Sequence, residues 1–228
     1  MAAIYKGSEF ICPGAILSTN YIITSASCAK KISDDKESKY MITVGSSELG
    51  KSTSEHAIDF AKPHEEYVHD KGYTQNDIGL VHTTESIFFG TTSQTIELYN
   101  GNFEYVNAEI VGWGGDSQGR MNNELQSLSV PIFASNDCNG RYHYLGKYIT
   151  YEQICAGNEK QGQSGLCMKD EGTPLVINGK LAGIATWYLS CASSLPDVYT
   201  WIPSHLEWIS KNLHQDSNHA QAEAVLLI

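Results

Sequence analysis

The sequence predicts an all-β fold with a helix at its C-terminal end, and three observations support this prediction. Short apolar runs rich in Ile and Val alternate with Gly, Asn, Ser and Asp along most of the chain. Asn178-Gly179 stands between two such runs and is a hairpin signal. Helical spacing is clear only near the end, where Pro203 occupies the expected first turn and apolar residues recur at Ile202, Leu206, Ile209 and Leu213. We therefore expect a β-barrel or β-sandwich closed by a C-terminal helix.

Each expected strand is a short apolar run bounded by turn residues. In the first half of the chain these runs are Ala15-Ile16-Leu17, Tyr21-Ile22-Ile23, Met41-Ile42-Thr43-Val44 and Ile78-Gly79-Leu80-Val81. In the second half they are 109–113, 175–177 and 181–185. The stretch 214–219 is polar and reads as a frayed tail after the helix.

Composition and charge exclude several classes of protein. The chain has 228 residues, of which 41% are hydrophobic and 18% charged, so it can bury a full core and is neither disordered nor a coiled coil. Fifteen basic and 26 acidic side chains give a formal net charge of −11, which repels phosphate backbones and anionic membranes. No run approaches the ~20 apolar residues that span a bilayer. We therefore expect neither a nucleic acid nor a membrane as partner.

Six cysteines indicate an oxidising compartment. They are widely spaced, and none forms a Cys-x-x-Cys unit of the kind found in zinc knuckles and thioredoxin-type motifs. Six cysteines allow fifteen pairings, and their spacing does not decide among them. An alternative also stays open, in which the protein is cytosolic and all six cysteines are buried free thiols. The first residues carry no apolar segment of signal-peptide length, so for a secreted protein we expect an incomplete N-terminus.

Seven segments in order resemble the chymotrypsin-like serine protease family. The segment 167–176 resembles the nucleophile loop, Cys-x-Gly-Asp-Ser-Gly-Gly-Pro-Leu-Val, 22–28 the histidine motif, and 76–81 the aspartate motif. The others are Gly112-Trp113-Gly114, 153–157, 183–187 and 196–200. The resemblance implies two six-stranded antiparallel β-barrels with a C-terminal helix. It also implies a single trypsin-like domain over 1–213, whose N-terminal barrel lacks its first segment, and a polar tail over 214–228. The implied disulfides are Cys12–Cys28, Cys138–Cys155 and Cys167–Cys191.

The departures from the family pattern concern its catalytic groups. Family enzymes use a serine nucleophile, a histidine base and an orienting aspartate, and only the aspartate, Asp77, is kept. Ser27 stands at the histidine position, and a hydroxyl is no general base near neutral pH. Glu171 stands at the nucleophile position, and Lys169 replaces a glycine of the oxyanion hole. We therefore expect no catalytic residues, and a pseudoprotease rather than an enzyme.

The resemblance also implies an altered specificity pocket. Gly165 stands where trypsin-like members carry an acidic residue, while Tyr188 and Asp197 each replace a glycine of the pocket. Because a tyrosine takes the place of a hydrogen atom at the entrance, we expect an occluded pocket. The family's buried N-terminal ammonium would pair with Asp170; we expect either that Asp170 lacks this partner or that the sequence lacks the N-terminal segment that supplies it.

Three further patterns have weaker functional interpretations. A new carboxylate nucleophile at Glu171 would need a second carboxylate ~5 Å away on a sugar-binding surface, which the resemblance does not place there. His64 and His69 are five residues apart, whereas a zinc helix needs histidines four apart, so we expect no metal and no cofactor. The segment 141–148 holds three tyrosines with Arg141, His143 and Lys147 and is either an interface or a loop packed on its own barrel.

The segments 25–28 and 170–174 resemble a narrower group, the scabies mite inactivated serine protease paralogues, relatives of group 3 mite allergens. This resemblance implies a secreted, monomeric protein of the gut lumen. It would bind host proteins and inhibit complement, which would be a form of immune evasion. Two alternatives stay open: a non-catalytic cofactor or decoy that regulates active serine proteases, and a weakly active hydrolase.

Overall fold

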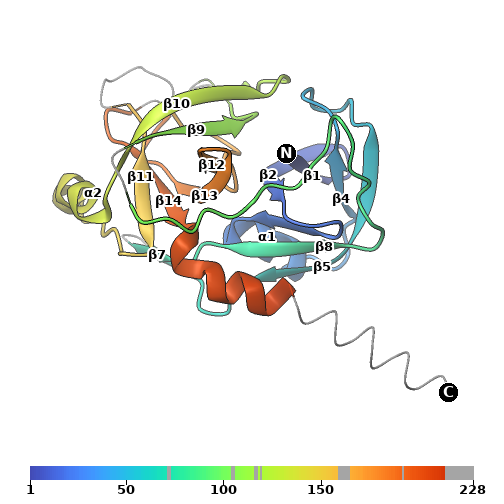
Figure 1. Ribbon diagram of the computed structural model, residues 1–228, viewed down its shortest axis with the longest axis horizontal. Helices are drawn as coiled ribbons and strands as arrows, with labels where there is room; N and C mark the ends of the chain where they lie inside the picture. Colours follow the sequence, from blue (N-terminus) through green and yellow to red (C-terminus); the bar gives the residue numbers. More distant parts are fainter. Residues whose placement is uncertain are drawn as a thin grey trace.

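Two closed six-stranded antiparallel barrels stand side by side in the computed structural model, as the resemblance implies (Figure 1). The structure describes residues 1–70, 73–103, 106–115, 118, 120–158, 165–191 and 193–213. The tail expected over 214–228 lies outside these residues. No helix among the described residues is long and apolar enough to cross a membrane.

The N-terminal barrel has the strand order β1-β2-β3-β8-β5-β4. These strands are β1 (Ala2–Lys6), β2 (Glu9–Ile16), β3 (Tyr21–Thr24), β4 (Tyr40–Val44), β5 (Ser54–Pro63) and β8 (Gly79–Thr83). β-Branched side chains such as Ile4, Ile22 and Ile42 fill its interior and are fully buried. The first strand is present, because β1 pairs with β2 on one side and with β4 on the other. The barrel therefore has no open strand edge there.

The C-terminal barrel has the order β10-β11-β14-β13-β12-β9. These strands are β9 (Asn107–Gly112), β10 (Gln126–Phe133), β11 (Gln153–Ala156), β12 (Pro174–Ile177), β13 (Lys180–Trp187) and β14 (Asp197–Trp201). The Asn178-Gly179 signal is confirmed, since these residues join β12 to β13 with φ of 51° and 76°, as a type I′ turn requires. A small hairpin of β6 (Val68–Asp70) and β7 (Tyr73–Gln75) lies outside both barrels.

A third apolar cluster joins the two barrels to the C-terminal helix. It combines Ile23 and Leu80 of the first barrel with Leu181 and Ile184 of the second. The predicted helix is confirmed: the 3₁₀ turn η2 (Ile202–His205) leads into a helix over 206–213, and its apolar side chains pack on this cluster. Figure 1 shows the helix crossing from the second barrel toward the first. The barrels are therefore held together by a shared core.

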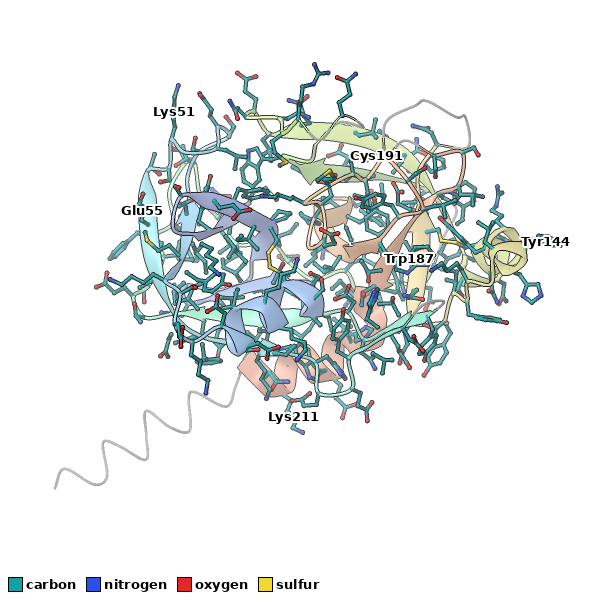
Figure 2. The ribbon with its side chains drawn as sticks, turned by 180° about the vertical axis from the view of Figure 1, so that it is seen from behind. Lys51, Glu55, Tyr144, Trp187, Cys191 and Lys211 are labelled. Atoms are coloured by element: carbon teal, nitrogen blue, oxygen red, sulfur yellow. A yellow bond between two sulfur atoms is a disulfide. The ribbon has the colours of Figure 1, made fainter. Side chains whose placement is uncertain are left out.

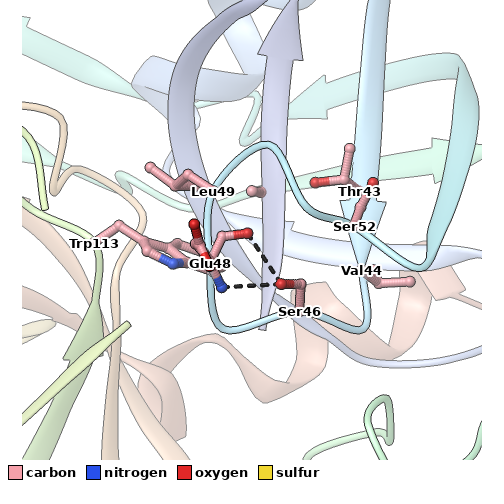
Figure 3. Close-up of a pocket in the computed structure, with 8 residues that line it drawn as sticks. Thr43, Val44, Ser46, Glu48, Leu49, Ser52 and Trp113 are labelled. Carbon is pink, nitrogen blue, oxygen red and sulfur yellow. Dashed lines mark hydrogen bonds between the residues drawn. The ribbon is translucent and has the colours of Figure 1, made fainter. Parts of the chain in front are cut away.

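The junction has a second contact at Trp113, which follows β9. Its indole Nε1 donates a hydrogen bond to the Ser47 carbonyl at 2.8 Å. Figure 3 shows the ring beside Leu49 and Glu48 at a small pocket, where the Ser46 hydroxyl bonds the backbone of Glu48. This contact fixes a loop of the first barrel against the residue that follows β9 in the second.

Three disulfides join Cys12 to Cys28, Cys138 to Cys155 and Cys167 to Cys191, the pairs that the resemblance implies. Their Cα–Cα separations of 6.5, 6.2 and 4.6 Å fall within the range that a disulfide spans. Each closes a loop whose constraint contributes ~3 kcal/mol in the chain-entropy account. The first anchors α1 (Ala26–Asp34), and the third anchors the loop that carries Glu171.

Candidate functional site

Ser27 lies in the first turn of α1, at the edge of the N-terminal barrel. Ser25 caps this helix, since its hydroxyl accepts from the Cys28 amide at 3.1 Å. The hydroxyls of Ser25 and Ser27 are 2.9 Å apart, and Ser27 is half-buried. The side chain at the family's histidine position is therefore a small hydroxyl bound to its neighbour.

Asp77 lies between β7 and β8 and is 1% exposed. One carboxylate oxygen accepts from the Ser27 amide at 2.8 Å, and the other accepts from the Thr186 hydroxyl. Burial raises the pKa of Asp77 to about 6, although these bonds oppose the rise. The nearby charge of Glu171 raises this pKa further. The structure therefore brings Ser27 and Glu171 close to Asp77, Ser27 through a hydrogen bond and Glu171 through its charge.

The loop that presents Glu171 begins with a tight turn over 167–170. The Asp170 amide donates to the Cys167 carbonyl at 3.2 Å, and Lys169 occupies the third position of the turn with φ of 64°. Glycine is preferred at such a position because a β-carbon is strained there. The Lys169 ammonium extends away to Glu9 Oε1 at 2.9 Å and the Phe10 carbonyl at 2.7 Å. Its charge is therefore held at β2.

We expect Lys169→Gly to be more stable than Lys169→Ala by about 1 kcal/mol. Both variants lose the two contacts of the ammonium, so the comparison isolates the backbone at φ of 64°. Denaturant unfolding of the two variants measures the difference. An alanine variant as stable as the glycine variant would show that this turn carries no strain.

Asp170, next to Glu171, points into the protein and is 6% exposed. Its carboxylate accepts from the Cys167 amide at 2.8 Å and the Thr173 hydroxyl at 3.3 Å. A β-carbon at Gly114 would overlap this carboxylate, which explains the glycine at that position. Burial raises the pKa of Asp170 to about 7, and the charge of Glu171 adds to the rise.

Asp197 lies against Gly165, and both are positions at which the sequence predicts the specificity pocket. Asp197 begins β14, is 3% exposed, and accepts from the Leu166 amide at 2.7 Å. A β-carbon at Gly165 would lie 2.8 Å from the same carboxylate oxygen, so a larger residue at 165 would displace Asp197. Burial raises the pKa of Asp197 to about 7. The two positions therefore hold one buried acid between them, at 197 instead of 165.

Tyr188 follows β13 and lies half-buried against the core of the C-terminal barrel. Burial raises the pKa of its hydroxyl, and the charges of Glu171, Asp170 and Asp197 raise it further. Tyr188 therefore lies within electrostatic range of both the family's nucleophile position and Asp197. We propose that it obstructs the pocket entrance.

We expect Tyr188→Gly to bind p-aminobenzamidine at least about tenfold more tightly than the unchanged chain at pH 8. Removing the ring opens the pocket, and the ionised Asp197 can then pair with the amidinium. Fluorescence titration measures the affinity. The double variant Tyr188→Gly with Asp197→Asn is the control and should lose the gain; an unaltered affinity in Tyr188→Gly would mean that the ring is no obstacle.

Two groups at the site were missed in the sequence. Thr186, 109 positions away in the sequence, donates a hydrogen bond to Asp77. The available signal was its place in the segment 183–187, where the family's Gly-Ile-Val-Ser-Trp motif also has a hydroxyl side chain. Burial raises the pKa of the Tyr67 phenol and the charges of Asp77 and Glu171 raise it further, which places Tyr67 near both; nothing in its sequence context indicates this.

The two histidines considered for zinc make separate contacts. The His64 ring packs on Trp208, while His69 Nδ1 lies 3.0 Å from the Thr74 hydroxyl. Within the part of the chain that the structure describes, no group of three or more His, Cys, Asp or Glu is arranged to hold a metal.

Comparisons with known proteins agree with this geometry. Residues 1–209 match the family described as Trypsin. Trypsin Blo t 3 of Blomia tropicalis is 33% identical over 216 residues, which cover 91% of this chain and 78% of that protein. The vitellin-degrading protease of Bombyx mori is 29% identical over 93% of this chain and 80% of its own. Neuropsin, a serine protease of mouse brain, has a TM-score of 0.81 at 28% identity, covering 93% of each chain.

These findings correct one expectation from the sequence. The expectation that the chain is a pseudoprotease and not an enzyme is wrong: its relatives are named trypsins and a protease, and its fold is that of a serine protease. That expectation rested on three positions, Ser27, Glu171 and Lys169, and gave no weight to the rest of the domain. These residues determine which functional groups the site contains, and both barrels remain those of the serine protease fold. With a family match over residues 1–209, the chain belongs to the trypsin family.

Proposed function

We propose that this trypsin-family chain acts on other proteins by binding them, and that its targets are host complement components. The observation that supports this most directly is the pair of side chains at two positions of the family's catalytic triad. The positions that hold an imidazole and a hydroxyl in a catalytic triad here hold the Ser27 hydroxyl and the Glu171 carboxylate. A carboxylate beside the buried Asp77 attracts cationic side chains of a bound protein.

The likeness of segments 25–28 and 170–174 to the scabies mite paralogues supports the choice of target, as does the mite source of Trypsin Blo t 3. Three disulfides support secretion, because such bonds persist in oxidising compartments. We propose that the protein acts as a secreted monomer.

A complement lysis assay in human serum tests this function. Purified protein added at graded concentrations should protect the target cells in a dose-dependent way. Protection accompanied by new serum-protein fragments on a gel would attribute the effect to cleavage instead of binding. Absence of protection would contradict complement as the target. Altered activation of a protease cascade in that case would favour the alternative role, a cofactor or decoy for active serine proteases.

A further inference from the structure

His205 is a buried titratable side chain outside the family's catalytic motifs. It ends η2, is 3% exposed, and stands at the start of the C-terminal helix. Figure 2 shows this helix, with Lys211 in its last turns, along the lower edge of the molecule. One ring nitrogen, Nδ1, lies 2.9 Å from the Trp201 carbonyl oxygen, and the other, Nε2, lies 3.2 Å from Asn76 Oδ1. His205 therefore joins the helix to the residue that precedes Asp77.

Asn76 continues the line of contacts that begins at His205. It is 6% exposed, and its Nδ2 donates a hydrogen bond to the Glu66 carbonyl at 3.1 Å. Three contacts thus run in series between two carbonyl oxygens, with the imidazole and the amide between them. Carbonyl oxygens only accept, so this series must receive its hydrogens from the two side chains.

A neutral imidazole cannot supply enough hydrogens for this series. Each contact needs one hydrogen between its two atoms, whereas a neutral imidazole supplies one and the Asn76 amide donates on only one of its two sides. Turning the amide around exchanges its oxygen and nitrogen but still leaves two hydrogen bonds in three contacts. The imidazolium carries a hydrogen on both nitrogens and makes all three. The series is therefore complete only when His205 is protonated.

The surroundings of His205 decide when it takes up that proton. Burial lowers the pKa of His205 from its ordinary value of 6.5, while the Trp201 carbonyl and the charge of Glu152 oppose this change. Glu152 lies in the segment that leads from α2 (Ser135–Tyr142) and η1 (His143–Leu145) to β11.

His64 faces His205 from the turn that follows β5. The two rings meet edge to face at 5.9 Å between centroids, and burial together with the charge of His205 lowers the pKa of His64. The other charged groups of that turn and of the end of β5 are Lys62, Glu65 and Glu66. With its pKa lowered, His205 is neutral at neutral pH, and one of the three contacts then lacks its hydrogen.

The series reaches the family's triad position because Asn76 begins the turn that presents Asp77. The backbone of Asn76 has φ of 53°, and its carbonyl accepts from the Ile78 amide at 2.8 Å. The Asp77 carbonyl accepts from Thr200 Oγ1 at 2.9 Å, and the Asp77 carboxylate accepts from the Ser27 amide. How firmly the Asn76 side chain is bound therefore affects how firmly this turn holds Asp77.

We propose that His205 is a proton-sensitive positioning residue for Asp77. As a neutral imidazole it leaves two of the three contacts as hydrogen bonds, and as an imidazolium it completes the third and fastens the Asn76 turn to the C-terminal helix. This role belongs to the chain itself and is independent of complement as the target. Because folding lowers the pKa of His205, its contribution to global stability is present above about pH 6.5 and is lost as the pH falls. Acid therefore tightens the turn locally while the charge on His205 costs overall stability.

Hydrogen exchange at the Ile78 amide, followed by NMR from pH 8 to pH 5, tests this role. The protection factor, which corrects for the pH dependence of exchange itself, should rise at least about tenfold as His205 gains its proton, because the turn gains one hydrogen bond. In His205→Gln, which takes up no proton at this position, that rise should be absent although Asp77 still titrates. His69→Gln is the matched control and should keep the rise, since His69 is exposed and lies outside the series. A rise of the same size in His205→Gln, or no rise in the unchanged chain, would overturn the proposal.

Asn76→Asp keeps the imidazole and gives a decisive result even where His205→Gln does not fold. A carboxylate at position 76 stabilises the imidazolium beside it, so the proton affinity of His205 should increase at least about tenfold. NMR titration of the imidazole signals measures this affinity, and the protection of the Ile78 amide should then rise at a correspondingly higher pH. A proton affinity that Asn76→Asp leaves unchanged would show that the two side chains do not meet, and the positioning role would be refuted.

Discussion

Ser27→His combined with Glu171→Ser is expected to raise the rate of labelling by a fluorophosphonate at least about 100-fold over the unchanged chain. The double substitution supplies an imidazole base and a hydroxyl nucleophile at the two positions where the family pattern requires them. The fluorophosphonate reacts with an activated serine without filling the specificity pocket, so Tyr188 does not mask the result. Active-site labelling over time, quantified on a gel, gives the rate.

The expectation depends on how well Asp77 is already placed. It is 1% exposed and held by the Ser27 amide and the Thr186 hydroxyl, so its carboxylate is fixed at the first turn of α1. An imidazole introduced at position 27 would start from that same turn and find a rigid acceptor. Replacing Glu171 also removes the charge that raises the pKa of Asp77, which favours the ionised carboxylate.

The single variants are the controls for cooperation between the two positions. Ser27→His alone lacks a hydroxyl nucleophile, and Glu171→Ser alone lacks a base, so each should give far less than the combined gain. Adding Asp77→Asn to the double variant should lower the rate again. A double variant no faster than the better single one would mean that the two positions do not meet in the cleft.

The strands were predictable because their causes are local, whereas the two-barrel arrangement was implied by the family resemblance. Strands such as β3 and β4 are rich in β-branched residues, and Asn178-Gly179 adopts the backbone that its residue types favour. The site was only partly predictable. The contact of Thr186 with Asp77 joins residues 109 positions apart, and the approach of Tyr67 depends on how the β6–β7 hairpin is placed. The periodic patterns of a sequence predict strands and helices, but they do not predict such long-range side-chain contacts. Three substituted positions also misled the expectation about enzymatic character, since they weigh less than the family match over the domain.

Asp197→Asn is expected to stabilise the protein at pH 8 by on the order of 3 kcal/mol and to leave it nearly unchanged at pH 4. The folded state raises the pKa of Asp197 from 3.8 to about 7, mainly through burial. A carboxyl with a raised pKa is protonated in the fold while the unfolded chain has already lost the proton. Its contribution to stability is therefore complete below about pH 4 and disappears as the pH rises through about 7.

The asparagine removes the cost of burying a charge but keeps an oxygen that can accept from the Leu166 amide. The pKa of Asp170 also rises to about 7, so its contribution to folding stability falls with rising pH in the same direction as that of Asp197. The unchanged chain should therefore lose stability as the pH rises from 4 to 7. The fully buried Tyr199 hydroxyl has no hydrogen-bond partner among the residues that the structure describes and lies within electrostatic range of both acids, so the asparagine amide also offers it a neutral neighbour.

Denaturant unfolding at pH 4, 6 and 8 measures the effect. The gap between Asp197→Asn and the unchanged chain should widen with pH. Asp34→Asn is a matched control, because Asp34 is exposed and its ion-pair partner is a lysine, a residue type that does not change charge between pH 4 and pH 8. A gap that stays constant from pH 4 to pH 8 would show that Asp197 is ionised in the folded protein throughout. Asp197 would then carry a charge from pH 4 to pH 8, and the binding of a cation to it would not weaken at the lower pH.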